Sequence, residues 1–401
     1  MNINVINNII ADITGRKRSL FKDDIDNNIS LLKENLNNKT VLVIGGAGSI
    51  GFEFIKEIIK FNIKRLFVID INENGLAELI RDLRSSYTNL PIIKTYPISF
   101  GSHIFEKLLT KEGPFEIIAN FAALKHVRSE KDPYAIEAMF QNNFILPTHL
   151  FSLLSENKPE RFFCVSTDKA TNPVSIMGAT KKLMEDVIFQ YADNFNITTA
   201  RFANVAFSNG SLLNSYLWRF YKNQPIVCPQ DIKRYFISPE EAGQLCLTAC
   251  ILGQTKEIFI PNLNPNKDLI NFTKTIEAFF NNINIPIDYC YTEQEAIEKA
   301  KKRKTNSKDP YPVYFFKTDT SGEKLYEEFH SENDIVDYTR FKNIGVIKFS
   351  INNLNNISII IDEAKKLFTN NVNKNDIIKF LEKFVSNFQY LDKGKTLDEK
   401  M

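Results

Sequence analysis

Side chains that can transfer protons follow an apolar run in the middle of the chain. Residues 161–167 are strand-like and end in Thr167, and Asp168 and Lys169 come directly after. Open α/β sheets bind ligands at the carboxyl ends of their strands, and an acid beside an amine can act there as general acid and base. We therefore predict a catalytic site at this position. The competing interpretation is a surface ion pair between Asp168 and Lys169.

The segment after this site is expected to form a helix that carries two further candidates. Met177 and Lys181 are four residues apart, so they lie one turn apart on the same helical face. Methionine has no exchangeable proton. The plain interpretation of Met177 is therefore helix packing, with its side chain filling space beside a ligand.

A glycine-rich turn follows the apolar run 41–45. Gly45, Gly48 and Gly51 have the spacing G-x-x-G-x-x-G and precede a helix-like segment. Such glycines allow a tight turn, close approach of a pyrophosphate, and close packing of the next helix. Asp70 ends the following apolar run, where its carboxylate can bind an adenosine ribose and would repel the 2′-phosphate of NADP. We predict NAD as the cofactor, the alternative being a purely structural turn.

Short apolar runs alternate with helix-like segments from residue 39 onward. This alternation predicts an α/β fold, a Rossmann-type, doubly wound parallel sheet with helices on both faces. The pattern loosens later, which predicts a smaller C-terminal substrate-binding region. The expected organisation is an N-terminal helical extension (1–38), an NAD-binding Rossmann core (39–204), a substrate-binding cap with some return to the core (205–330), and a C-terminal helical tail (331–401).

The composition argues against several classes of protein. There are 50 lysines and arginines against 48 aspartates and glutamates, so no strong overall field attracts nucleic acid. Five cysteines without C-x-x-C pairing and four scattered histidines favour reduced thiols and no metal site. No apolar stretch is long enough for a membrane helix. We expect a cytoplasmic protein that binds neither nucleic acid, metal nor membrane.

The segment 166–181 carries a family resemblance. Its string STDKATNPVSIMGATK is similar to that of the UDP-N-acetylglucosamine 4,6-dehydratases of the extended short-chain dehydrogenase/reductase superfamily. Met177 occupies the tyrosine position and Lys181 the lysine position of the Tyr-x-x-x-Lys element. Methionine there is typical of the C5-retaining branch in polysaccharide biosynthesis. Related strings at 122–127, 201–205, 234–242 and 322–328 extend the resemblance, which is to a soluble form of that catalytic domain.

The resemblance implies a 4,6-dehydratase with tightly bound NAD that acts on a UDP-sugar. Such an enzyme oxidises C4, removes the C5 proton and the C6 hydroxyl as water, and returns hydride to C6. Asp168 would be the base for the C4 hydroxyl and then the acid for the C6 hydroxyl, with Thr167 bonded to the C4 oxygen. Lys169 would be the base at C5 if a lowered pKa keeps it neutral.

The same resemblance implies further contacts. Those to the cofactor would include Ser49, Ile50, Ala122 and Lys181, the last of which would bond to the nicotinamide ribose. Those to the substrate would include Lys125, His126, Arg201, Asn204, Arg234 and Lys317. Arg234 would clamp the pyrophosphate with a bidentate fork, whereas for His126 a satisfied loop histidine is an equal alternative. Glu327 and Glu328 are expected on a helix surface.

Other functions remain open at this stage. A nucleotide-sugar 4-epimerase needs no acid at C6, and a C5-inverting dehydratase would share the same site. A non-catalytic NAD-binding sensor would explain the methionine at position 177. The resemblance also implies a homodimer or a higher homo-oligomer.

Overall fold

The computed structural model describes residues 2–305, 307–349, 357–369 and 372–395. Within these ranges a nine-stranded sheet has the order β14-β15-β10-β6-β5-β4-β1-β2-β3. All its strands from β10 to β3 pair in parallel, and β15 and β14 continue it antiparallel. The strands are β1 (Thr40–Ile44), β2 (Arg65–Ile69), β3 (Ile92–Tyr96), β4 (Ile117–Asn120), β5 (Arg161–Val165), β6 (Ile197–Ala200), β10 (Glu257–Pro261), β14 (Val336–Asp337) and β15 (Ile344–Lys348).

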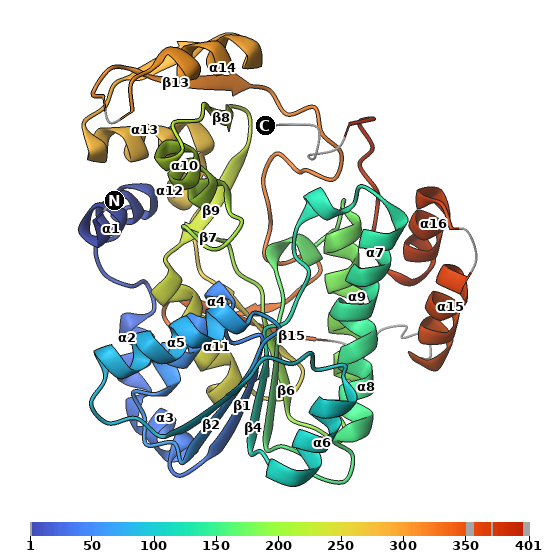
Figure 1. Ribbon diagram of the computed structural model, residues 1–401. Coiled ribbons are helices and arrows are strands. Elements are labelled where there is room, and N and C mark those ends of the chain that lie inside the picture. Colours follow the sequence, from blue (N-terminus) through green and yellow to red (C-terminus); the bar gives the residue numbers. More distant parts are fainter. Residues whose placement is uncertain (1, 306, 350–356, 370–371, 396–401) are drawn as a thin grey trace.

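Helices cover both faces of this sheet (Figure 1). Side chains alternate along a strand, so Leu42 and Ile44 of β1 join one apolar cluster and Val41 and Val43 join the other. The first cluster includes residues of α6 (His103–Glu112), α7 (Pro133–Phe140), a π-helical turn (Gln141–Ile145), α8 (Leu146–Leu153), α9 (Ile176–Gln190), α15 (Ile357–Thr369) and α16 (Lys374–Phe384). The second includes residues of α2 (Lys22–Asn27), α3 (Ile29–Leu36), α4 (Ser49–Ile58), α5 (Glu73–Ser86) and α11 (Pro239–Leu252).

A smaller cap lies above the sheet in Figure 1. Two three-stranded sheets build it, with the orders β11-β9-β7 and β12-β13-β8. Their strands are β7 (Asn204–Val205), β8 (Ile226–Pro229), β9 (Lys233–Ile237), β11 (Leu269–Asn271), β12 (Ile287–Cys290) and β13 (Tyr311–Phe316). The helices of this region are α10 (Leu212–Tyr221), α12 (Pro265–Asp268), α13 (Phe272–Ile283) and α14 (Glu293–Lys302).

The predicted fold class is confirmed, and two details differ from the prediction. Strand β3 was not expected, since its residues are only partly covered and give a weak apolar signal. The expectation of a wholly helical tail is wrong, because β14 and β15 lie within 331–401 and extend the central sheet. Ile344, Val346 and Ile347 of β15 are buried there, which explains why this short apolar run pairs with β10. The proposed domain boundaries stay predictions.

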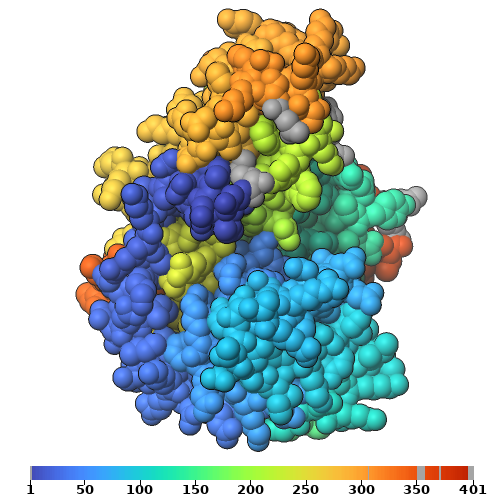
Figure 2. All heavy atoms as spheres, turned by 60° about the vertical axis from the view of Figure 1, so that its left-hand side comes forward, coloured from blue at the N-terminus to red at the C-terminus, as the bar shows by residue number. Residues whose placement is uncertain are grey.

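The N-terminal segment joins the cap to the main sheet. Helix α1 (Ile3–Thr14) packs on α13 through Ile9, Ile10 and Ile13, which belong to the apolar cluster of the cap. Helices α2 and α3 pack instead with the layer around α11. In Figure 2 this segment, in dark blue, lies between the yellow and orange cap and the blue part of the main domain.

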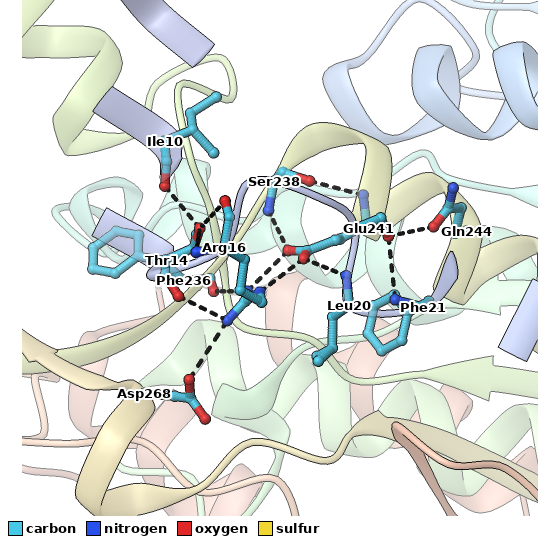
Figure 3. A network of polar contacts seen from close by, with 11 residues as sticks. Ile10, Thr14, Arg16, Leu20, Phe21, Phe236, Ser238, Glu241, Gln244 and Asp268 are labelled. Carbon is cyan, nitrogen blue, oxygen red and sulfur yellow. Dashed lines mark hydrogen bonds and ion pairs between the residues drawn. The ribbon is translucent and has the colours of Figure 1, made fainter. Parts of the chain in front are cut away.

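A buried carboxylate holds the chain where α1 has ended (Figure 3). The two oxygens of Glu241 accept hydrogen bonds from Nε and Nη2 of Arg16 at 2.9 and 3.0 Å. They also accept from the backbone amides of Leu20, at 2.8 Å, and Ser238, at 2.7 Å. Arg16 further donates to the carbonyl of Phe236. One carboxylate on α11 thus ties the N-terminal segment to β9 and to the helix that covers the sheet.

Replacing Arg16 should therefore weaken the whole fold. In Arg16→Ala the carboxylate of Glu241, only 2% exposed, loses its cationic partner, and breaking a buried pair from one side costs about 3 kcal/mol. We expect a matching drop in the free energy of unfolding in urea. Arg18→Ala is the control, because Arg18 pairs with Asp23 in solvent. Equal unfolding midpoints for the two variants would contradict this role of Arg16.

Candidate active site

A cavity of about 330 Å³ opens where the strands of the main sheet end and the cap begins. The glycine turn after β1, the loop after β4, the segment after β5, the start of α9 and the segment 202–212 form its walls. Strand order reverses between β1 and β4, and such a reversal opens a crevice at the carboxyl edge of the sheet. The lining residues include Gly45, Gly48, Ser49, Ile50, Gly51, Lys125, His126, Thr167, Asp168, Lys169, Met177, Lys181 and Asn204.

The glycine turn has the geometry of a phosphate-binding turn. Gly45 has a φ of +75°, and a Cβ on it would stand 2.6 Å from the amide nitrogen of Ala122. A Cβ on Gly51 would stand 2.4 Å from the carbonyl oxygen of Gly45. No side chain caps the start of α4 at Gly48, so amide groups of the first turn face the cavity unsatisfied and can bind an anion.

Asp70 lies beside the turn. Its carboxylate accepts hydrogen bonds from the amides of Ala47 at 3.0 Å and Asn72 at 2.9 Å. These bonds fix the carboxylate next to the glycine turn, and its role in ribose binding stays a prediction. Asp70 and Ala122 do not themselves line the cavity, although Phe121 and Ala123 on either side of Ala122 do.

Three polar side chains meet at the end of β5. Oδ1 of Asp168 accepts hydrogen bonds from Oγ1 of Thr167 at 2.9 Å and from Nζ of Lys169 at 3.0 Å. The Asp168 residue is 2% exposed, so this is no surface ion pair. A carboxylate, an ammonium and a hydroxyl are thus presented together to the cavity.

The charge state of Lys169 differs from the expectation. Burial acts to lower the pKa of Lys169, but the carboxylates of Asp168 and Glu327 outweigh burial and raise the pKa. The condition attached to the role of Lys169 as a base, a lowered pKa, is therefore not met in this arrangement of charges. The role itself stays a prediction.

Helix α9 places Met177 and Lys181 in the cavity wall, both buried. Nζ of Lys181 donates to the carbonyl of Val165 at 2.7 Å, and burial lowers the pKa of this lysine. The backbone amide of Met177 donates to Oε1 of Glu130 at 2.8 Å. Glu130 thus binds the start of the helix, where a carboxylate complements the helix dipole.

The loop after β4 supplies Lys125 and His126. Burial, and next the charge of Lys169, lower the pKa of Lys125. Burial, followed by the charges of Lys125 and Arg128, lowers the pKa of His126. The imidazole of His126 lies against Gly210, where a Cβ would approach Cε1 to 2.5 Å. A lysine and an imidazole therefore line the same cavity as the glycine turn.

Three predicted substrate contacts are not brought to the cavity. Arg201 is buried, bonds Glu185 through Nε and Nη2 at 2.8 and 2.6 Å, and uses Nη1 on Thr171 and Phe329. Arg234 is also buried, and its guanidinium donates to the carbonyls of residues 233, 324 and 325. Lys317 is exposed after β13 and does not line the cavity. The two arginines hold the fold here, which corrects the prediction that they bind the diphosphate.

One functional candidate was underrated from the sequence. Glu327 was expected on a helix surface, yet it is buried, and its Oε1 lies 3.6 Å from Nζ of Lys169 and 3.6 Å from Nη2 of Arg234. The resemblance of the string 322–328 was recognised from the sequence. Without a helical pattern in this segment, however, the sequence does not distinguish a buried glutamate from one on the surface. Glu328, the next residue, is exposed.

The sheet, the cap and the glycine turn define an α/β protein with a Rossmann-type sheet. The chain belongs to the polysaccharide biosynthesis protein family, which matches residues 41–349.

Three curated relatives are similar in sequence. The uncharacterized membrane protein MJ1061 of Methanocaldococcus jannaschii is 32% identical over 86% of this chain and 96% of that protein. The capsular polysaccharide biosynthesis protein CapD of Staphylococcus aureus is 27% identical over 81% of this chain, which spans 50% of CapD. An inverting UDP-N-acetylglucosamine 4,6-dehydratase of Campylobacter jejuni is 28% identical over 57% of this chain and 68% of that enzyme.

Two solved structures share the fold. Pen from Bacillus thuringiensis has a TM-score of 0.62 at 20% identity, over 78% of this chain and 90% of Pen. WbmF from Bordetella bronchiseptica in complex with NAD⁺ has a TM-score of 0.51 at 16% identity, over 68% of this chain and 89% of WbmF.

Membrane-spanning helices and metal-binding clusters are both absent from the described ranges. Within the described ranges, every helix is too short or too polar to span a bilayer. The histidine, cysteine, aspartate and glutamate side chains described here form no cluster of three or more that could hold a metal ion. All five cysteines are buried, unpaired thiols.

Glu130 should make stability depend on pH. Burial raises the pKa of Glu130 from 4.5 to about 7, against the backbone hydrogen bonds of Met177 and Ile176 and the charge of Lys374. A raised carboxyl pKa favours folding below pH 4.5, and that contribution is lost as pH rises through 7. The free energy of unfolding of wild type should therefore fall by about 3 kcal/mol relative to Glu130→Gln between pH 4 and pH 8.5. Urea titrations measure this difference, with the exposed Glu156→Gln as control, and a pH-independent difference would contradict it.

Proposed function

We propose that the protein is an NAD-dependent nucleotide-sugar 4,6-dehydratase. It converts UDP-N-acetylglucosamine to a UDP-4-keto-6-deoxy-N-acetylhexosamine for glycan biosynthesis. The observation that carries the proposal is the hydrogen-bonded group of Thr167, Lys169 and the buried Asp168, which lines the same cavity as the glycine turn. The family, the dehydratase among the relatives and the 166–181 string all support it.

The residues present fit NAD. Gly45 and Gly51 have no side chain in the tight turn, so a pyrophosphate can contact the backbone there. The carboxylate of Asp70 lies beside the turn and can accept hydrogen bonds from an adenosine ribose. The same cavity is lined by Ser49, Ile50 and Lys181, and the backbone of Ala122 lies against Gly45. NAD, when bound, accepts hydride from C4 and returns it to C6.

Asp168 performs both proton transfers at oxygen in this proposal. It accepts the proton of the C4 hydroxyl, while Thr167 donates a hydrogen bond to the C4 oxygen. The C4 ketone makes the C5 proton acidic, and Lys169 removes that proton. Asp168, now protonated, gives its proton to the departing C6 hydroxyl. Because Asp168 is buried and hydrogen bonded to Lys169, its carboxylate has a fixed place in the wall of the cavity before the reaction begins.

Lys125, His126 and Asn204 are the substrate contacts that the cavity supports. The ammonium group of Lys125 can pair with a phosphate or donate a hydrogen bond to the sugar. The neutral imidazole of His126 can also donate a hydrogen bond. Arg201, Arg234 and Lys317 are left out of this set, because they do not reach the cavity. We further propose a cytoplasmic homodimer or larger homo-oligomer, as the resemblance implies.

Three alternatives share the fold. A nucleotide-sugar 4-epimerase would have no use for an acid at C6, and a C5-inverting dehydratase would differ only in the face on which C5 is reprotonated. A non-catalytic NAD-binding sensor would have no use for a buried acid and amine in its cavity. Burying those charges is costly, which favours the catalytic proposals.

Incubation with UDP-N-acetylglucosamine tests the proposal directly. We expect NMR to show a 4-keto-6-deoxy product, with the proton configuration at C5 reporting retention or inversion. Asp168→Asn should lower kcat by about 10²–10⁴-fold, since it removes the acid and base at oxygen. Asp193→Asn, an exposed aspartate outside the cavity, is the control. A 4-epimer product would support the epimerase, and bound NAD without any product would support the sensor.

A substitution at Met177 can distinguish a packing role of this side chain from a role in the reaction itself. Met177→Leu conserves side-chain volume, and such swaps usually cost less than about 1.5 kcal/mol. If Met177 only packs beside the reacting groups, kcat should stay within about tenfold of wild type. Single-turnover assays at saturating substrate measure this. A fall of more than about a hundredfold in a folded variant would show that the thioether itself takes part in the reaction.

A further inference from the structure

A second carboxylate stands behind the catalytic lysine. Glu327 comes from the segment that follows β13, far along the chain from Lys169, and is 4% exposed. Its Oε1 is 3.6 Å from Nζ of Lys169, the same ammonium that donates a hydrogen bond to Asp168. Its Oε2 is buried and makes no hydrogen bond to any described residue. Lys169 is thus placed between two buried carboxylates.

Arg234 fixes the position of Glu327. Its Nη1 donates to the carbonyls of Lys233 and Leu325, and its Nη2 donates to the carbonyl of Lys324. The same Nη2 lies 3.6 Å from Oε1 of Glu327. The guanidinium is thus bonded to the backbone two and three residues before Glu327, which holds this segment of the chain next to Lys169. A carboxylate held in this way, with one oxygen unpartnered, has a role beyond filling space.

We propose that Glu327 is a positioning residue that holds the ammonium of Lys169 beside Asp168 and takes up its proton once Asp168 is protonated. Lys169 then becomes the neutral amine that removes the proton from C5 of the sugar. This inference rests on the proposed dehydratase function and deepens it, because it supplies the event that makes Lys169 a base.

The protons balance over one turnover. The C4 hydroxyl gives its proton to Asp168 as hydride leaves C4. Lys169 then gives a proton to Glu327 and takes the C5 proton, while Asp168 gives its proton to the C6 hydroxyl, which leaves as water. Hydride returns to C6, Lys169 returns its proton to C5, and Glu327 returns its proton to Lys169. Asp168, Lys169 and Glu327 end in their starting states.

The electrostatics favour this order of events. Of the two carboxylates that raise the pKa of Lys169, Asp168 is the one hydrogen bonded to it. Protonation of Asp168 removes this larger effect. Burial can then lower the pKa of Lys169. Burial raises the pKa of Glu327, and the charges that act on it are those of Lys169, Asp168, Arg234 and Lys324. Protonation of Asp168 also removes a charge that raises the pKa of Glu327. This change in the pKa of Glu327 is smaller than the change in the pKa of Lys169, because Asp168 is hydrogen bonded to Lys169 and not to Glu327.

The distance between the two groups sets one condition. A separation of 3.6 Å from Nζ to Oε1 is longer than a hydrogen bond, so the side chains must approach by about 0.6 Å or share a water for the proton to pass. Lys169 has that freedom once Asp168 is neutral, because its short bond to Asp168 weakens at the same moment.

The test separates oxidation at C4 from proton removal at C5. Wild type, Glu327→Gln, Glu327→Asp and Glu328→Gln are mixed with UDP-N-acetylglucosamine in deuterated water. NADH absorbance follows C4 oxidation, and NMR follows deuterium at C5. We expect Glu327→Gln to form NADH within about threefold of wild type and to lose C5 exchange by about 100-fold, because an amide cannot accept the proton. Glu327→Asp should recover much of the exchange, and Glu328→Gln, at the exposed neighbour, should match wild type.

Several outcomes would overturn the inference. Normal C5 exchange in folded Glu327→Gln would show that Lys169 loses its proton elsewhere. Equal loss of NADH formation and C5 exchange would mean that Glu327 only supports the fold of the site. If Glu327→Gln fails to fold, the result for Glu327→Asp is decisive. Retained deuterium exchange at C5 in this variant supports the inference, and complete loss of that exchange in the folded variant contradicts it. Absence of NADH and product in wild type would instead refute the proposed function itself.

Discussion

The reversal of strand order between β1 and β4 is the constraint on which the site depends. The chain leaves β1 toward α4 on one face of the sheet and leaves β4 toward α7 on the other. Backbone cannot fill the space between two such departures, so a crevice remains at the carboxyl edge. The glycine turn and the loop that carries Lys125 form its rim, and β5 delivers Asp168 beside them. The cap completes the cavity with residues 202–212.

Buried ion pairs tie this site to distant parts of the chain. Arg201 joins β6 to Glu185 on α9, and Arg16 joins the N-terminal segment to Glu241 on α11. Burying such pairs costs desolvation, and each survives because several hydrogen bonds satisfy both partners. The bonds of Arg201 to Thr171 and Phe329 show the result, since one guanidinium holds α9, the segment after β5 and the returning chain together.

The same principle explains how an acid and an amine can work in a protein interior. Asp168 and Lys169 share a hydrogen bond and lie at the wall of a cavity, so each can be reached by a ligand while its charge is satisfied. Glu327 adds a second negative charge 3.6 Å from the amine. The protonation of any one of the three groups therefore changes the proton affinity of the other two.

The sequence by itself determined the fold class, most of the parallel strands and the glycine turn, and it indicated the residues that are proposed to react. Local patterns carry that information, since periodicity marks strands and helices and glycine spacing marks a tight turn. It also marked Asp168 and Lys169 as neighbours in the chain.

Only the tertiary structure decided what surrounds these residues. Arg201 and Arg234 have the right chemistry for a diphosphate, but long-range contacts with Glu185 and with residues 324–327 use their guanidinium groups inside the fold. Glu327 looks like a surface glutamate until the chain returns and buries it against Lys169. The strand β15 joins the sheet because β10 offers it a free edge. Burial and pairing between distant segments have no local pattern, so the physical balance that sets the charge of Lys169 could not be predicted from residue order.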